Sequence, residues 1–128
     1  MKPKILLIDD VKEFSSILSI ILSCRYCVVT AKDGVEALVL LEQGYIPDVI
    51  ITDLEMPRMD GCTLISVIKN CESLRDIPII VLSNYDKLDY RALLKEKGVS
   101  SYIIKPYCTF ELKEIIDNSL NAALTNCG

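Results

Sequence analysis

Polar side chains that can do chemistry follow several short apolar runs in this 128-residue sequence. Asp9 and Asp10 follow the first run, Asp53 the third, Ser83 the fourth and Lys105 the fifth. Carboxylates suit a hard cation such as Mg²⁺, which binds one or two of them and keeps several waters. A lysine adds a mobile positive charge, and a serine adds a hydroxyl. If folding brings these side chains together, they form a site for a divalent cation.

The apolar runs predict the elements that position these residues. Each run is too short for a helix, and most are rich in Ile and Val, as strands buried in a parallel sheet are. The runs cover residues 5–8, 27–30, 49–52, 79–82 and 102–104. Because helical patterns alternate with the runs, we expect one α/β domain with a doubly wound parallel sheet.

The helical patterns are apolar stripes with the spacing of one helix face. Gly44 and Gly98 stand where the second and fourth helices are expected to end. The five stripes are Phe14, Ile17, Leu18 and Ile21; Val35, Leu38 and Leu41; Leu64, Ile65 and Ile68; Leu88, Ala92 and Leu93; and Leu112, Ile115, Ile116, Leu120 and Ala123.

The polar residues should converge, because ligands of such sheets bind at the carboxyl ends of the strands. Three carboxylates at one edge repel each other, and a hard cation would relieve that repulsion. Each residue alone has an ordinary explanation. Asp9 or Asp10 could cap a helix, Asp53 could cap a turn, Ser83 could be a loop serine, and Lys105 could pair with a surface acid. Their joint placement favours a site.

The composition excludes several classes of function. The net charge of −4 disfavours direct nucleic-acid binding, which needs clustered Lys and Arg. Histidine is absent, so this chain alone cannot build a Ser-His-Asp triad, a His-ligated metal site or a phosphohistidine. No signal peptide is evident, and the apolar segment 14–24 is too short to span a bilayer. We therefore expect a cytoplasmic protein without membrane contact.

Two of the six cysteines, Cys24 and Cys27, form a C-x-x-C pattern. Such a pair can be a redox centre or half of a zinc site. No second C-x-x-C exists, and the pair falls at a predicted helix-to-strand join. These cysteines are more simply interpreted as small buried hydrophobic residues.

Four motifs together identify a family. LLIDD lies near the start, DLEMPRMDG in the middle, VLSN after the fourth run and YIIKP near the end. In order and separation they resemble the receiver domain of two-component response regulators, and in particular chemotaxis regulators. The resemblance covers essentially the whole chain, 1–128. It implies a (βα)5 fold with the flavodoxin-like strand order 2-1-3-4-5.

The resemblance implies a role for each matching residue. Asp53 matches the phosphoacceptor. Asp10 and Asp53 match direct ligands of Mg²⁺ or Mn²⁺, the backbone carbonyl of Glu55 matches a third ligand, and Asp9 matches an acid that holds the metal through water. Lys105 matches the lysine that binds the phosphoryl oxygens.

The same resemblance implies a switch and structural residues. Ser83 matches the switch hydroxyl and Tyr102 the switch aromatic. Pro106 matches a proline that is cis in the family. Pro57 and Gly61 belong to the central motif and match structural positions.

The implied function is signalling. A histidine kinase or phosphotransfer protein would supply the phosphoryl group, and the chain would catalyse its own phosphorylation and slow dephosphorylation. The phosphoryl oxygens would attract Ser83 and Lys105, and Tyr102 would then swing inward. This would change the face built by the fourth helix, fifth strand and fifth helix, which would control a downstream protein target or output domain. A phosphorylation-dependent dimer through that face is also implied.

Two other functions occur on similar folds. A flavin-binding domain needs a phosphate cradle after the first strand, where Asp9 and Asp10 would repel the phosphate. An aspartyl-nucleophile phosphatase of the haloacid-dehalogenase type needs a D-x-D motif, which Asp53-Leu54-Glu55 lacks. Whether the chain is a stand-alone regulator or part of a larger protein is left open by the sequence.

Overall fold

A computed structural model describes residues 2–54, 59, 61–83, 88–104 and 109–127. For residues 88–91 and 123–127 it describes the backbone alone. Four predicted site residues lie outside the described residues, namely Glu55, Pro57, Lys105 and Pro106. Their roles stay predictions.

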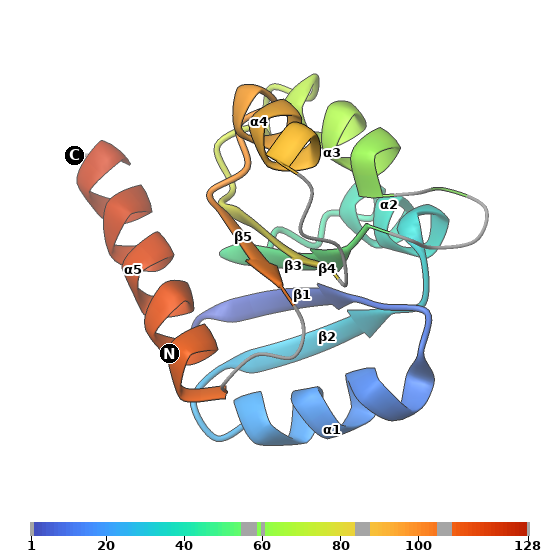
Figure 1. The fold of residues 1–128 in the computed structure, drawn as a ribbon. Coiled ribbons are helices and arrows are strands. Elements are labelled where there is room, and N and C mark those ends of the chain that lie inside the picture. The colour runs from blue at the N-terminus through green and yellow to red at the C-terminus, as the bar shows by residue number, and fades with distance from the viewer. Residues whose placement is uncertain (1, 55–58, 60, 84–87, 105–108, 128) are drawn as a thin grey trace.

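The sheet has five parallel strands in the order β2-β1-β3-β4-β5, as expected for the flavodoxin-like arrangement (Figure 1). Each strand begins and ends within one residue of its predicted run. The strands are β1 (Lys4–Ile8), β2 (Cys27–Ala31), β3 (Val49–Asp53), β4 (Ile79–Ser83) and β5 (Ser101–Ile104).

Helices cover both faces of the sheet (Figure 1). α1 and α5 pack on one face, and α2, α3 and α4 pack on the other, which gives two separate hydrophobic cores. No helix of the described part is long and apolar enough to cross a bilayer. The helices are α1 (Lys12–Leu22), α2 (Gly34–Glu42), α3 (Gly61–Lys69), α4 (Leu88–Glu96) and α5 (Thr109–Cys127).

The central strands are apolar on both sides because both sides are covered. In β1, Leu6 and Ile8 enter the core beneath α2, α3 and α4, whereas Ile5 and Leu7 enter the core beneath α1 and α5. All four side chains are at most 1% exposed. Burial of each such side chain stabilises the fold by about 1.5–3 kcal/mol, so the strand ends that carry the polar residues are held firmly.

The predicted buried face of α1 is wrong by part of a turn. The helix buries Ser15, Leu18 and Leu22, and it leaves Ile17 61% exposed. A serine can occupy the buried face because its hydroxyl donates a hydrogen bond to the Lys12 carbonyl at 3.1 Å. The apolar spacing is compatible with two orientations of the helix about its axis. The sequence favoured the wrong one because the correct orientation buries a serine, whose hydroxyl is hydrogen-bonded within the helix.

The ends of two helices agree with the sequence, but one buried face does not. Gly44 and Gly98 adopt φ values of 98° and 93°, a conformation that favours glycine after a helix. In α4 the buried leucine is Leu94, whereas Leu93 is 42% exposed. The prediction that Leu93 faces the core is therefore wrong by one residue.

A buried tyrosine joins the α1–β2 turn to α5. The Tyr26 ring is 2% exposed, and its hydroxyl donates a hydrogen bond to Asp117 Oδ1 at 2.7 Å. Burial, followed by that hydrogen bond, raises the pKa of Tyr26 from 10.0 to about 12. Arg25 lies 3.4 Å from the other carboxylate oxygen of Asp117. The turn is thus fixed to the last helix across one core.

The interpretation of Cys24 and Cys27 as buried residues is wrong. Both are exposed free thiols. Cys24 follows the end of α1, and Cys27 begins β2, which is an edge strand covered on fewer sides than the central strands. Sequence spacing alone did not show which strand would be at the edge.

Candidate functional site

Two neighbouring strands bring three carboxylates together. β1 and β3 are paired, and Ile8 at the end of β1 aligns with Thr52. Asp9 and Asp10 follow Ile8, and Asp53 follows Thr52. The carboxylate oxygens of Asp9, Asp10 and Asp53 lie within 4.8 Å of one another. The predicted convergence of these three aspartates is confirmed.

The three carboxylates differ in exposure. Asp9 is 3% exposed. Its backbone N–H donates to the Ala31 carbonyl at 3.0 Å, and its Oδ1 accepts a hydrogen bond from the Val11 N–H at 2.9 Å. Asp53 is half-buried and Asp10 is exposed. The site is therefore anchored at Asp9 and open to solvent at Asp10.

This donor set fits a hard divalent cation. Like charges at this separation repel one another, and a cation between them would offset the repulsion. Carboxylate oxygens are the ligands that Mg²⁺ prefers, and the open side at Asp10 leaves room for the waters that Mg²⁺ retains. Mn²⁺ takes the same ligands. Asp9, Asp10 and Asp53 can thus hold such an ion.

The first residue of α3 lies closely against the end of β3. The Gly61 N–H donates to the Leu54 carbonyl at 2.9 Å. A Cβ atom at Gly61 would lie 2.6 Å from the Asp53 backbone oxygen and 2.9 Å from Leu54 Cα. That same Asp53 oxygen accepts a hydrogen bond from the Thr52 hydroxyl at 2.9 Å. Glycine is therefore required at position 61 to keep the Asp53 backbone in place.

Ser83 lies at the same edge of the sheet. It ends β4, where Asp53 of β3 aligns with Leu82, one residue earlier. The serine side chain is 1% exposed. Its partner in β5 is Ile104, the residue before Lys105. The pairing brings Ser83 to the strand adjacent to the Asp53 strand, whereas the position of Lys105 is outside the described residues.

Tyr102 shares a face of the sheet with Ser83. Val81, two residues before Ser83 and on the same side of β4, belongs to the core beneath α2, α3 and α4. Tyr102 is half-buried, and it packs against this same core. A movement of Ser83 and a movement of Tyr102 would therefore take place on one side of the sheet.

A cavity beside the carboxylates was not predicted. Its volume is about 370 Å³, and it lies where β1 and β2 end and α1 and α2 begin. The sequence places few chemically useful residues after β2, yet Lys32 and Glu36 border this cavity as well. The cavity is lined by Asp9, Asp10, Lys12, Ser15, Thr30, Ala31, Lys32 and Glu36.

The fold and the site define a class of protein: an α/β domain whose parallel sheet presents an acidic cation site at its carboxyl edge. Comparison with known proteins is more specific. The sequence profile of the response regulator receiver domain matches residues 5–117, so the chain belongs to the response regulator receiver family. It is a receiver domain of two-component signalling systems, and neither alternative function gains support.

Relatives show the contexts in which such domains occur. The chain is 37% identical to part of the hybrid signal transduction histidine kinase D of Dictyostelium discoideum, over 87% of this chain and 7% of that protein. It is 39% identical to part of the probable transcriptional regulator ycf27 of Guillardia theta, over 88% of this chain and 43% of that protein. The chain thus spans less than half the length of either relative.

A solved receiver-domain structure has the same fold as this chain. The response regulator receiver domain protein of Clostridium thermocellum superposes with a TM-score of 0.84 and 30% sequence identity. The match covers 94% of this chain and 95% of that one. The strand order predicted from the resemblance is therefore confirmed by both the topology and this comparison.

Proposed function

We propose that this receiver domain accepts a phosphoryl group on Asp53. The observation that carries the proposal is the carboxylate cluster of Asp9, Asp10 and Asp53 at the edge of the sheet. A carboxylate oxygen of Asp53 attacks the phosphorus atom, and the bond from phosphorus to the donor breaks. With phosphohistidine as donor, the P–N bond breaks and the imidazole leaves with the electron pair. The product is an acyl phosphate.

The residues around Asp53 have distinct tasks in this reaction. Asp10 and Asp53 would bind Mg²⁺ or Mn²⁺ directly, with the Glu55 carbonyl, and Asp9 would hold the ion through water. The bound cation would neutralise charge on the transferring phosphoryl group. Asp9 is well suited to an outer role, because Val11 already occupies one of its oxygens. Lys105 would bind the phosphoryl oxygens, as the family resemblance implies.

The output is a change on one face of the domain. The Ser83 hydroxyl would donate to a phosphoryl oxygen, and Tyr102 would move inward on the same side of the sheet. Ser83 is buried, whereas Tyr102 is only half-buried, so the tyrosine has a solvent-facing side from which to move. The α4–β5–α5 face would then bind a protein target or an output domain, or form a dimer.

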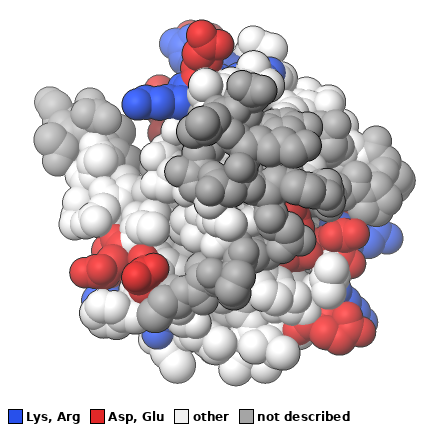
Figure 2. Space-filling model, viewed as in Figure 1, with Lys and Arg blue, Asp and Glu red and all other residues white. Residues whose placement is uncertain are grey.

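The proposed phosphodonor is the one used by receiver domains in general. A histidine kinase or phosphotransfer protein supplies the phosphoryl group, which agrees with the absence of histidine from this chain. The described surface visible in Figure 2 carries acidic and basic side chains close together along its right edge, without a broad basic patch. The net charge of −4 supports a protein partner rather than a nucleic acid. The expected cytoplasmic location stays a prediction.

The test is chemical phosphorylation followed by intact-mass measurement. The chain is incubated with acetyl phosphate, with and without Mg²⁺. We expect one phosphoryl adduct that requires the metal and is lost in Asp53→Ala. Asp76→Ala, which removes an exposed carboxylate distant from the cluster, should react as the wild type does. An adduct of equal yield in Asp53→Ala would overturn the assignment.

A further inference from the structure

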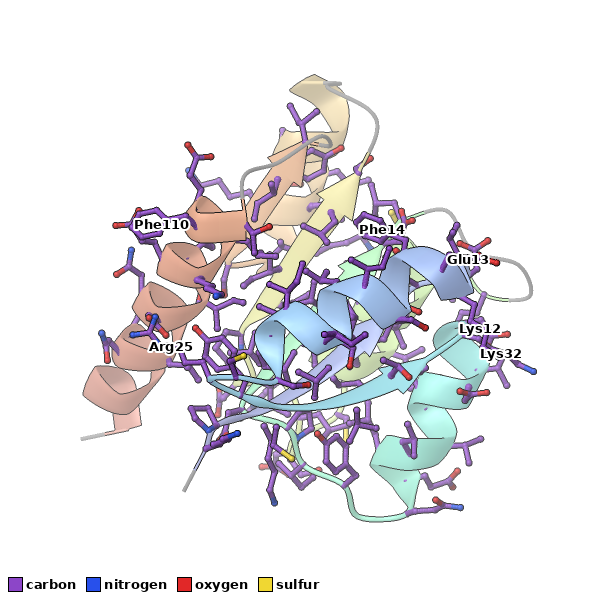
Figure 3. All side chains as sticks on the ribbon, turned by 90° about the horizontal axis from the view of Figure 1, so that it is seen from below. Lys12, Glu13, Phe14, Arg25, Lys32 and Phe110 are labelled. Carbon is purple, nitrogen blue, oxygen red and sulfur yellow. The ribbon has the colours of Figure 1, made fainter. Side chains whose placement is uncertain are left out.

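Two lysines line the cavity beside the carboxylates. Lys12 is the first residue of α1, and Lys32 follows β2. Figure 3 labels both near the start of α1 and the end of β2. Both residues are exposed. Two cationic side chains from separate elements therefore border the space through which a ligand can approach Asp9 and Asp10.

The two lysines offset much of the negative charge beside the cavity. Asp9, Asp10 and Glu36 line the cavity together with the two ammonium groups, and Asp53 adds a fourth carboxylate within 4.8 Å of Asp9 and Asp10. Four carboxylates and two ammonium groups leave two net negative charges, which a divalent cation at the carboxylates would neutralise. Without the two lysines, two net negative charges would remain even with the cation bound. The lysines thus decide whether the metal-loaded site is neutral or repels an anion.

The ammonium groups of Lys12 and Lys32 are available to interact with an anion in the cavity. Among the residues that the structure describes, neither the Lys12 nor the Lys32 ammonium group forms an ion pair. Lys32 contributes only its backbone N–H to Glu36, at 3.3 Å. The cavity is about 370 Å³ in volume, so its walls are separated by about one Debye length at physiological salt or less. Charges on its walls therefore act on an anion inside it.

We propose that Lys12 and Lys32 form an electrostatic guide that draws the anionic phosphoryl group of the donor into the cavity beside the carboxylates. The inference rests on the proposed function, because it assumes an anionic phosphodonor. Steering of this kind raises an association rate and depends on ionic strength. The same two charges disfavour the cation, because they lie near its ligands. They therefore have opposite effects on the two ligands of the site.

Removing the two charges should therefore change phosphodonor binding and Mg²⁺ binding in opposite directions, which a merely structural role would not do. In the double variant Lys12→Met/Lys32→Met, the rate of adduct formation with acetyl phosphate at saturating Mg²⁺ should fall about 3–10-fold at low ionic strength. Mg²⁺ binding measured by titration calorimetry should become about 2–5-fold tighter. Both differences should shrink in high salt. Loss of folding would weaken both processes.

Two control variants separate charge from other effects. Lys12→Arg/Lys32→Arg retains the charges and should behave as the wild type does. Lys4→Met/Lys95→Met removes the same charge from exposed positions that do not line the cavity, and should also leave both measurements unchanged. An unchanged rate in the Met variant, or a rate and a Mg²⁺ affinity that fall together, would overturn the guide. If the wild type forms no adduct on Asp53, the proposed function itself fails.

Discussion

The hydrogen bond between Tyr26 and Asp117 predicts how much stability the variant Tyr26→Phe loses. The substitution keeps the buried ring and removes the hydroxyl that donates to Asp117 Oδ1 at 2.7 Å. A hydrogen bond to a charged acceptor contributes about 1.5–3 kcal/mol. The Asp117 side chain is 35% exposed, so water replaces part of what is lost. We expect the free energy of unfolding at neutral pH to fall by about 1–2 kcal/mol.

The raised pKa of Tyr26 predicts a further effect at high pH. The unfolded tyrosine ionises near 10.0, whereas the folded one stays protonated until about 12. Between these values the unfolded state has lost a proton that the folded state keeps, so stability falls as pH rises. The full shift corresponds to about 2–3 kcal/mol, which is present below pH 10 or so and lost by about pH 12. Tyr26→Phe lacks this contribution.

Urea unfolding followed by far-UV circular dichroism, at neutral pH and at steps up to about pH 11, measures both effects. The wild type should lose stability more steeply than Tyr26→Phe as the solution becomes alkaline. Asp117→Asn keeps an acceptor oxygen and removes the charge, so its loss at neutral pH should be smaller than that of Tyr26→Phe. Equal stability and equal alkaline slopes for wild type and Tyr26→Phe would refute the reasoning.

Three further predictions concern the core and the site. Gly61→Ala should lower the free energy of unfolding by about 2–3 kcal/mol, because its Cβ would collide with the Asp53 backbone oxygen; a urea midpoint equal to that of the wild type would count against this. Ile65→Ala, at a side chain with no exposed surface, should cost about 2–5 kcal/mol in the same assay, whereas Ile20→Ala, at a side chain that is 72% exposed, should stay within about 0.5 kcal/mol; similar losses for both would show that the buried face is misassigned. Asp9→Ala should weaken Mg²⁺ binding about 10–100-fold by calorimetry, as expected for a residue that supports the ion through water, and unchanged affinity would remove it from the site.

The sheet and the carboxylate cluster were predictable because they depend on strong, local signals. A central parallel strand is apolar on both faces, and β1, β3 and β4 are buried throughout or nearly so. Once the strands are placed, parallel pairing puts Asp9, Asp10 and Asp53 at one edge without any knowledge of loops. The cluster thus follows from strand boundaries that were correct to within one residue.

The errors arose where tertiary packing chooses between similar local patterns. Ser15 of α1 is buried and Ile17 is exposed, because the rotation of the helix is set by its contacts with the sheet rather than by the best apolar spacing. Cys27 is exposed because β2 is an edge strand. Lys12 and Lys32 were not singled out, since their meeting at one cavity depends on how two connections return to the sheet.

The most direct test of the central claim identifies the residue that carries the phosphoryl group. The chain is phosphorylated with acetyl phosphate and Mg²⁺, treated with borohydride to reduce the acyl phosphate to an alcohol, digested and sequenced by tandem mass spectrometry. We expect the reduced side chain at position 53, with positions 9 and 10 unmodified. Reduction at Asp9 or Asp10, or a phosphoryl group that resists borohydride on a serine or threonine, would contradict the account.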